Sequence, residues 1–438
     1  MSGTEGDLDP RTERSPAVEP SKPRILKVLG PGLITGASDD DPSGIATYSQ
    51  VGAQYAYGAS WTLLFSYPLM SAIQMISARL GRTTGRGIAG NLRRYYPNWL
   101  VYTGVCLLVI ANIINIGADI GAMGDAVKLI IGGPALVYVV LFGAGCAIAQ
   151  VFLQYKKYVR ILKWLSLALL SYVATLFIVK IDWAALATGF FTPHIEFSSD
   201  YLMAIVAIFG TTISPYLFFW QASQEVEDLK EKPKRHPLKD SPEQAKEADQ
   251  RIELDTLAGM GISNFIALSI MVTAAATLNV HHITDIGSSA QAAEALEPVA
   301  GKFAELLFVI GIVGTGLLAV PVLAGSAAYG LGEALRWPTG LARKPKDAKA
   351  FYATIAIATM LGVALNFAPV NPIQALFWSA VVNGVVAVPI MVIMMLMSTD
   401  KRIMGEQVIG GWLLGLGWLS TGVMALCAVG MGASAVLN

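Results

Sequence analysis

Three consecutive carboxylates followed by a proline lie inside a stretch that otherwise has the composition of a membrane-spanning segment. Asp39–Asp41 precede Pro42, and apolar residues continue beyond Gly44 to Ala53. Ionisable groups at membrane depth are costly, so those that persist usually line a water-filled path or bind a charge. Proline removes a backbone donor and glycine loosens the chain, so we expect the helix to break near residues 41–44. A broken helix that exposes carbonyls beside a carboxylate is typical of a cation site.

The composition is that of a protein embedded in a lipid bilayer. Of the 438 residues, 54% are hydrophobic and 14% are charged, whereas soluble domains carry about 25% charged residues. The net charge of zero gives no indication of a nucleic-acid partner. The three cysteines form no CxxC or Cys/His zinc pattern, so we expect no cofactor. Residues 1–24 are polar and rich in Pro, Glu and Ser, and they are predicted to be a disordered cytoplasmic tail.

The apolar segments and the charged loops predict a topology. Lys and Arg gather in alternate loops, so the bias toward positive cytoplasmic loops places the N-terminus in the cytoplasm and the C-terminus outside the cell membrane. The charged segment 225–253 is then cytoplasmic, and either partly disordered or helical. We expect a monomer. Eleven segments reach the roughly 17–25 residues that a span requires: about 28–57, 60–80, 100–122, 133–154, 160–180, 201–229, 254–279, 302–333, 350–367, 373–397 and 408–436.

A second interruption is predicted in the sixth span. Gly210, Thr211, Ser214 and Pro215 stand among apolar residues there. The first and sixth spans are five apart and run in opposite directions. Interrupted helices at corresponding positions of two halves indicate a transporter with inverted repeats and a site at the bilayer midplane. The alternative is an ordinary proline kink, but the carboxylates beside one break favour the transporter.

The groups at the two breaks are oxygen ligands. The first offers the Asp41 carboxylate, the Ser43 hydroxyl and unwound carbonyls, and the second offers the Thr211 and Ser214 hydroxyls with further carbonyls. Hard oxygen ligands suit Mg²⁺, Mn²⁺ or Ca²⁺, whereas thioether or imidazole favours softer ions. Since Mg²⁺ releases its water reluctantly, small and flexible ligands suit a partly hydrated ion.

Other polar residues are candidates for supporting roles. Neighbours on a helix point about 100° apart, so Asp41 is the expected ligand. Asp39 and Asp40 then either attract cations or cap a helix or pair with a basic group. Asp119 in the third span is either an anchor or pathway residue, or an acid satisfied by backbone donors. Asn383 in the tenth span either lends its carbonyl oxygen to the site or bonds a neighbouring helix.

The motif Asp41-Pro-Ser-Gly44-Ile-Ala-Thr, followed by Gln50-Val-Gly-Ala53, closely resembles the first-helix signature of the Nramp divalent-metal transporters. The family has Asp-Pro-Gly-Asn, Phe-Ala-Thr and Gln-Ala-Gly-Ala there. Residues 210–216 occupy the place of its Gly-Ala-Thr-Val-Met-Pro-His. The resemblance implies an all-α, LeuT-like fold with eleven transmembrane helices. Two inverted five-helix repeats, about 25–180 and 201–397, would contain the broken helices 1 and 6, and helix 11 would span 408–436.

The resemblance assigns a metal site, with departures. The binding aspartate carries over to Asp41, while Gly44 replaces the family's asparagine, Thr211 its alanine and Ser214 its methionine. The methionine is the soft ligand with which the family favours transition metals. The chain is therefore more similar to the Nramp-related magnesium transporters, and we expect uptake of Mg²⁺ and Mn²⁺ by alternating access.

The groups associated with proton movement in the family are largely replaced. Tyr216 and Gln221 stand in place of sixth-helix histidines, Ala122 in place of a glutamate and Ala380 in place of a glutamine, while Asp119 survives. We therefore expect uptake without proton coupling.

Three alternatives remain. One is a conventional proton-coupled Mn²⁺/Fe²⁺ importer of the family, and another is a cation-coupled transporter of small organic solutes on the same fold. The third is an intramembrane hydrolase in which Asp41 and Asp119 share a proton.

Overall fold

The computed structural model describes residues 35–36, 38–152, 166–232 and 234–437, and the regular secondary structure of these residues is entirely helical. The predicted N-terminal tail, the start of the first span and the start of the fifth span lie outside the described residues. Helices overlap all eleven predicted spans. Seven helical segments of the described chain are long and apolar enough to cross a bilayer, and α17 (Lys349–Leu365) is a shorter apolar helix.

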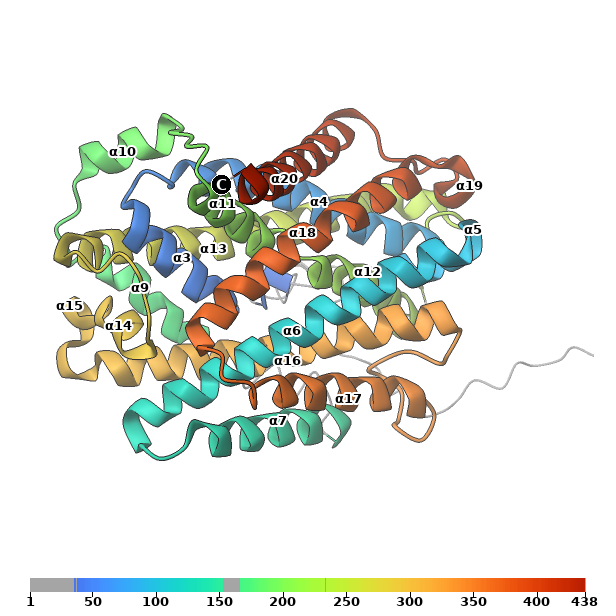
Figure 1. The fold of residues 1–438 in the computed structure, drawn as a ribbon. Coiled ribbons are helices and arrows are strands. Elements are labelled where there is room, and N and C mark those ends of the chain that lie inside the picture. The colour runs from blue at the N-terminus through green and yellow to red at the C-terminus, as the bar shows by residue number, and fades with distance from the viewer. Residues whose placement is uncertain (1–34, 37, 153–165, 233, 438) are drawn as a thin grey trace, which may run out of the picture.

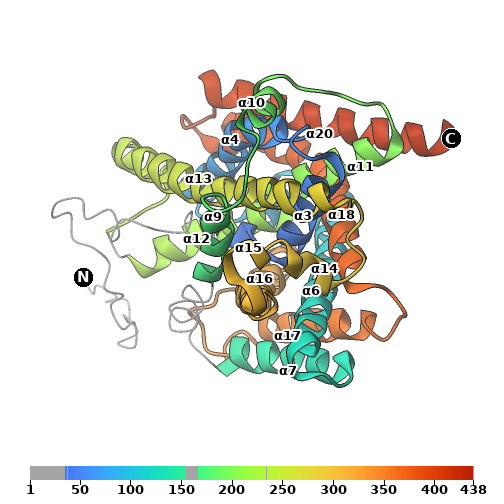
Figure 2. The same ribbon diagram turned by 90° about the vertical axis from the view of Figure 1, so that its left-hand side faces the viewer.

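The helices form one bundle in which the interrupted ones lie near the centre (Figures 1 and 2). Around them, α6 packs along α16, α3 packs against α13, and α11 packs against α18. The helices of the bundle are α3 (Pro42–Tyr55), α4 (Trp61–Thr84), α6 (Asn98–Ile131), α7 (Ala135–Phe152), η1 with α9 (Ser166–Leu169 and Leu170–Thr175), α11 (Ser199–Thr212), α12 (Pro215–Glu231), α13 (Ala245–Thr277), α16 (Ala304–Leu335), α17, α18 (Pro372–Thr399) and α20 (Gly411–Leu437). Short helices in the connections are α5 (Ile88–Tyr95), α10 (Trp183–Phe191), α14 (Ser289–Glu294), α15 (Glu297–Ala300) and α19 (Lys401–Met404).

Two helices extend further than their apolar sequence predicts. Helix α6 continues to Ile131, beyond the expected end near residue 122, and stops at Gly132, whose φ is 76°. Helix α13 begins at Ala245 instead of near residue 254. Its charged first turns are tolerated because Asp249 pairs with Arg79 and Arg251 pairs with Glu225. The charged residues therefore show where the apolar sequence ends, but both helices extend past them.

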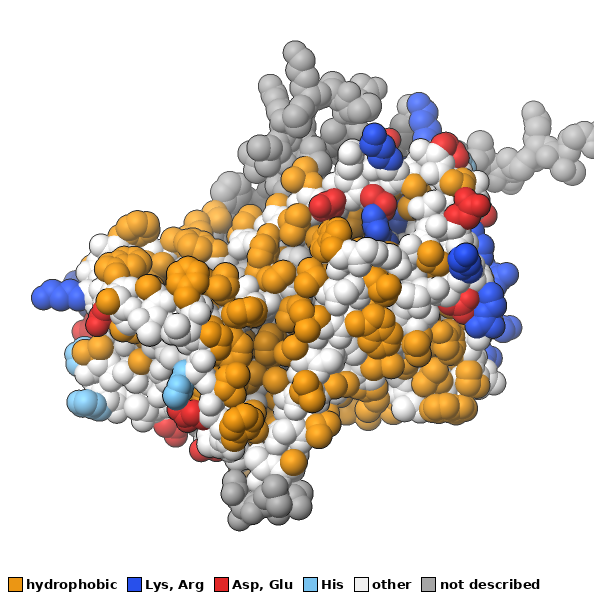
Figure 3. All heavy atoms as spheres, turned by 90° about the horizontal axis from the view of Figure 1, so that it is seen from above, with side chains coloured by type: hydrophobic (Ala, Val, Ile, Leu, Met, Phe, Trp, Pro, Cys, Tyr) orange, Lys and Arg blue, Asp and Glu red, His pale blue; other side chains and the backbone are white. Residues whose placement is uncertain are grey.

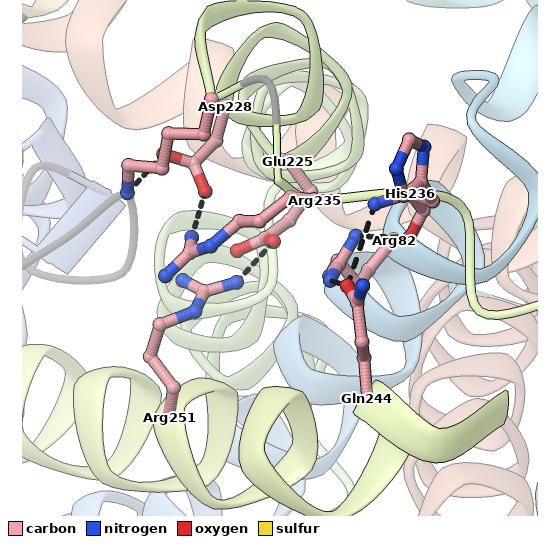
Figure 4. Close-up of polar contacts among 8 residues, drawn as sticks. Arg82, Glu225, Asp228, Arg235, His236, Gln244 and Arg251 are labelled. Atoms are coloured by element: carbon pink, nitrogen blue, oxygen red, sulfur yellow. Dashed lines mark hydrogen bonds and ion pairs between the residues drawn. The ribbon is translucent and has the colours of Figure 1, made fainter. Parts of the chain in front are cut away.

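The segment 225–253 is largely helical in the structure, so of the two expectations the helical one applies. A polar network ties the ends of α4, α12 and α13 together (Figure 4). Arg251 pairs with Glu225, whose side chain is fully buried. The Arg82 guanidinium donates to the His236 carbonyl at 2.7 Å and to the Gln244 side-chain oxygen at 2.9 Å. The three helix ends are thus joined by charge-assisted bonds, which are stronger than neutral ones.

Apolar and charged side chains occupy different parts of the surface. A broad band of apolar side chains covers the middle of the face in Figure 3, and Lys and Arg gather at the end that carries α5 and α19. Histidines lie at the opposite end (Figure 3). The exposed large hydrophobic residues of the protein include Phe65, Ile110, Trp378 and Leu426. An exposed apolar surface of this kind is stable when lipid covers it.

Glycines allow the closest helix contacts near the centre. A Cβ added at Gly210 of α11 would lie 1.9 Å from the Ala380 carbonyl oxygen and 2.6 Å from the Gly384 amide nitrogen of α18. A Cβ at Gly52 of α3 would lie 2.2 Å from the Met271 carbonyl oxygen of α13. Backbone atoms cannot rotate away as a side chain can, so both helix pairs depend on the missing side chain.

We expect Gly210→Ala to separate α11 from α18 and to destabilise the protein by about 1–3 kcal/mol, the usual cost of overpacking. The measurement is the thermal unfolding midpoint of the purified protein in detergent. The matched control is Gly422→Ala on α20, where an added Cβ meets nothing within 4 Å. Equal midpoints for the two variants would contradict the close contact.

Candidate cation site between two helix breaks

The first break is stabilised by the side chain of Asp41. The chain is helical at Asp39, bends at Asp40, and begins α3 at Pro42. Asp41 is the N-cap of α3, and its Oδ1 accepts hydrogen bonds from the Gly44 amide at 2.8 Å and the Ser43 hydroxyl at 2.6 Å. Proline suits the first position of a helix because its missing N–H would have no partner there. Asp41 and Pro42 together therefore end one helical segment and start the next.

The second break has a similar cause. Helix α11 ends at Thr212 and α12 begins with Pro215, so Ile213 and Ser214 lie between them. The Ser214 hydroxyl donates to the carbonyl oxygens of Gly210 at 2.6 Å and Thr211 at 3.0 Å. It thereby satisfies carbonyls that the end of a helix leaves without an intrahelical partner. The hydroxyl oxygen keeps its lone pairs available.

The structure brings the two breaks into contact. The Tyr216 hydroxyl donates to the Ser38 carbonyl at 2.9 Å and reaches Asp41 Oδ2 at 3.4 Å. The Thr211 hydroxyl lies 3.1 Å from the point that a Cβ would occupy at Gly44. Since Gly44 has no side chain, the hydroxyl occupies the space beside the Asp41 turn. We call the group of residues at the two breaks the central site. It consists of Asp41, Ser43, Gly44, Thr211 and Ser214, which are all buried.

The chemistry of this cluster is that of oxygen. No group of three or more His, Cys, Asp or Glu side chains is arranged to hold a metal in the part of the chain that the structure describes. A cation between the breaks would therefore be held by the Asp41 carboxylate together with hydroxyls, carbonyls and water. Hard divalent ions accept such a ligand set.

Asn115 of α6 orients the carboxylate, although it was not among the residues expected at the site. Its amide nitrogen donates to Asp41 Oδ2 at 3.0 Å, and its oxygen accepts from the Ser379 hydroxyl of α18 at 2.7 Å. Asp41 thus has four donors, of which Tyr216 is the most distant. The available signal was an asparagine within an apolar span, which Asn112 shares.

Asp39 and Asp40 face α13 instead of the central site. The Ser263 hydroxyl lies 2.6 Å from Asp39 Oδ2 and 3.2 Å from Asp40 Oδ1. Both side chains are buried. The pairing with a basic group that the sequence left open is not found among the described residues, so a hydroxyl and not a cation accompanies these two acids.

Three candidates remain, namely Asp119, Gln221 and Asn383. Asp119 is fully buried beside the backbone N–H of Ser43, and neither of its carboxylate oxygens makes a hydrogen bond of ordinary geometry with a described residue. Gln221 accepts a hydrogen bond from the Thr35 hydroxyl at 2.5 Å. Asn383 is buried without a hydrogen bond to any described group, although Gly384 beside it packs against Gly210.

Contacts close the chain on both sides of the breaks. On one side, Thr35 bonds Gln221, and a Cβ at Gly36 would lie 2.4 Å from the Gly259 carbonyl oxygen of α13. On the other side, Gln50 of α3 accepts from the Ile286 amide at 2.9 Å and donates to the Thr284 carbonyl at 3.2 Å. The described residues on both sides of the breaks are thus bonded to distant parts of the chain.

Comparison with known proteins identifies the family. The model for the Nramp family, described as natural resistance-associated macrophage protein-like, matches residues 32–434. The chain belongs to the Nramp family. Its curated relatives include the divalent metal cation transporter MntH of Yersinia enterocolitica, 28% identical over 71% of this chain and 72% of that protein. MntH of Pectobacterium carotovorum is 26% identical over 90% and 91% of the two chains.

Solved structures show the fold of this Nramp protein. The Eremococcus coleocola manganese transporter superimposes with a TM-score of 0.74 at 16% identity, covering 98% of this chain and 91% of that one. Mhp1, a nucleobase-cation-symport-1 family transporter, gives a TM-score of 0.56 at 13% identity, covering 93% of each chain. The predicted LeuT-like fold is confirmed.

We expect Asn115→Ala to lower the affinity of the central site for a Mn²⁺ probe by about tenfold, as losses of partners behind a ligand commonly do. The measurement is titration calorimetry on the purified protein. Asn112→Ala is the matched control, because this buried asparagine lies one turn away on α6 and bonds the Leu323 carbonyl and the Ser326 hydroxyl instead of Asp41. An unchanged affinity in Asn115→Ala would contradict the orienting role.

Proposed function

We propose that this Nramp-family protein carries divalent cations, Mg²⁺ and Mn²⁺, across the cell membrane by alternating access. The observation that carries the proposal is the buried Asp41 carboxylate at the first break, held against the second break by Tyr216 at 3.4 Å. The Thr211 and Ser214 hydroxyls lie at the second break. The names of the MntH relatives and of the Eremococcus manganese transporter support divalent metal as the cargo. The matched relatives are transporters, so the hydrolase alternative gains no support.

Selectivity follows from the donor set. Ser214 stands where the family resemblance places a methionine, so the thioether that favours transition metals is replaced by a hydroxyl. Gly44 and Ser214 are also small, which leaves room for water to remain on the ion. Because Mg²⁺ prefers oxygen ligands and keeps several waters, we infer that the central site admits Mg²⁺ as well as Mn²⁺.

Uptake into proteoliposomes tests this selectivity. We expect Mg²⁺ to compete with Mn²⁺ uptake in the native protein, and Ser214→Met to lower this competition by about tenfold, because a soft thioether stabilises Mn²⁺ more than Mg²⁺. Ser214→Ala is the control that removes the hydroxyl without adding sulfur. Asp41→Ala should abolish uptake of both ions. Strict Mn²⁺ selectivity in the native protein would overturn the magnesium proposal.

We also propose that uptake is driven by membrane potential without protons. The central site has Tyr216 and Gln221 where the family resemblance places histidines, and the four histidines of the chain are at positions 194, 236, 281 and 282, away from both breaks. A divalent cation gains about 4.6 kcal/mol per 100 mV, which corresponds to about three decades of accumulation. The potential alone is therefore a sufficient driving force.

The expected result is that Mn²⁺ uptake, driven by an inside-negative potential, leaves the pH of the vesicle lumen unchanged. A pH-sensitive dye inside the vesicles provides the measurement, and vesicles without protein provide the baseline. Acidification that depends on the metal and disappears in Asp119→Asn would show that Asp119 moves protons and that the transporter is coupled.

The proposal includes the orientation and assembly of the chain. The end with α5 and α19, where Lys and Arg gather (Figure 3), would face the cytoplasm together with the N-terminus, and the C-terminus would lie outside. We propose a monomer in which residues 25–180 and 201–397 form the two inverted repeats.

A further inference from the structure

A cavity of about 90 Å³ lies near the ends of three helices. Helices α13 and α20 both pack against α4 (Figures 1 and 2). Since α20 follows α19 in the chain, the cavity lies at the end of the protein where Lys and Arg gather. One water needs roughly 15 Å³ of such space, so the cavity admits a larger polar group. Its lining includes Met75 and Arg79 of α4, Asp249 and Glu253 of α13, and Gly410 and Trp412 at the start of α20.

The cavity holds one guanidinium and two carboxylates. Arg79 pairs with Asp249 through a single nitrogen, Nη2, so other N–H groups of the guanidinium are available. Glu253 lies within electrostatic reach of Asp249, and in the described part of the chain its side chain forms no ion pair or hydrogen bond. A guanidinium suits phosphate, and a free carboxylate suits a cation. The cavity is therefore complementary to a group that carries both charges.

The surroundings of the cavity are those of a membrane interface. Trp412 lines the cavity and is 57% exposed, and tryptophan is enriched where a bilayer meets water. Both flanking helices also expose large apolar side chains, namely Leu254, Ile262 and Phe265 of α13 and Leu419 of α20. These side chains would contact acyl chains while the charged groups of the cavity contact a headgroup, so the surface favours a lipid over a water-soluble zwitterion.

We propose that this cavity binds the headgroup of a phospholipid that carries a primary ammonium group. The ammonium would donate to the Glu253 carboxylate, and the phosphate would accept from the Arg79 guanidinium. A primary ammonium has three N–H donors, whereas the quaternary ammonium of a choline headgroup has none, and a glycerol headgroup brings no cation to Glu253. The lipid site lies apart from the central site and does not depend on which cation is carried there.

Counting bound lipids by native mass spectrometry tests the proposal. The full-length protein in detergent is mixed with equal concentrations of phosphatidylethanolamine and phosphatidylcholine that have the same acyl chains. We expect the native protein to retain phosphatidylethanolamine about tenfold better, the effect of one hydrogen bond to a charged group. Glu253→Ala should lose this preference. The matched control is Glu247→Ala, which removes an exposed carboxylate of α13 outside the cavity lining and should keep it.

A second variant fills the cavity without changing its charges. A Cβ at Gly410 meets nothing within 4 Å, so Gly410→Leu can occupy the space without displacing neighbouring groups, and it should lose the bound phosphatidylethanolamine. Gly415→Leu on α20 is the control, because a Cβ there also meets nothing within 4 Å and the residue lies outside the lining. Equal retention of the two lipids by the native protein, or a preference that persists in Glu253→Ala or in Gly410→Leu, would overturn the lipid site.

Discussion

The carboxylate of Asp41 has two roles that depend on each other: it caps α3, and it faces the second break. As the N-cap of α3, it satisfies the Gly44 amide and the Ser43 hydroxyl, which allows the helix to restart after Asp40. As an acceptor held by Asn115 and Tyr216, it faces the second break. The helix cap and the acidic group of the site are thus one side chain. The group that stabilises the break is therefore also the group that a cation would use.

Much of this arrangement could be predicted from the chain alone. Proline at positions 42 and 215, each next to small polar residues in an apolar stretch, located both breaks, and spacing them five spans apart indicated that they meet. The structure places them in contact through Tyr216. The absence of sulfur and imidazole at the breaks could also be read directly, since it requires no knowledge of packing.

Other features depended on contacts between distant segments. Asn115 and Ser379 join α6 to α18 across 264 positions, and an asparagine within an apolar span gives no indication of its partner. Nothing in the sequence distinguishes Ser263 from other serines of membrane helices, and its contacts with Asp39 and Asp40 are visible only in the structure. The extent of α13 was underestimated because charged residues were taken to end the span, whereas Arg251 is paired with the buried Glu225.

The polar network at the ends of α4, α12 and α13 has a consequence for movement. Arg82, Glu225 and Arg251 bind these helices to one another (Figure 4), so they are expected to shift as one rigid unit. The described residues just before Asp41 are attached to that unit by hydroxyl hydrogen bonds and by the close approach of Gly36 to Gly259. Thr35 bonds Gln221, Tyr216 bonds the Ser38 carbonyl, and Ser263 bonds Asp39 and Asp40. Each of these neutral hydroxyl contacts costs less to separate than a buried ion pair. We therefore expect the short stretch that bears the acids to be displaced more easily than α4, α12 and α13 are separated from one another.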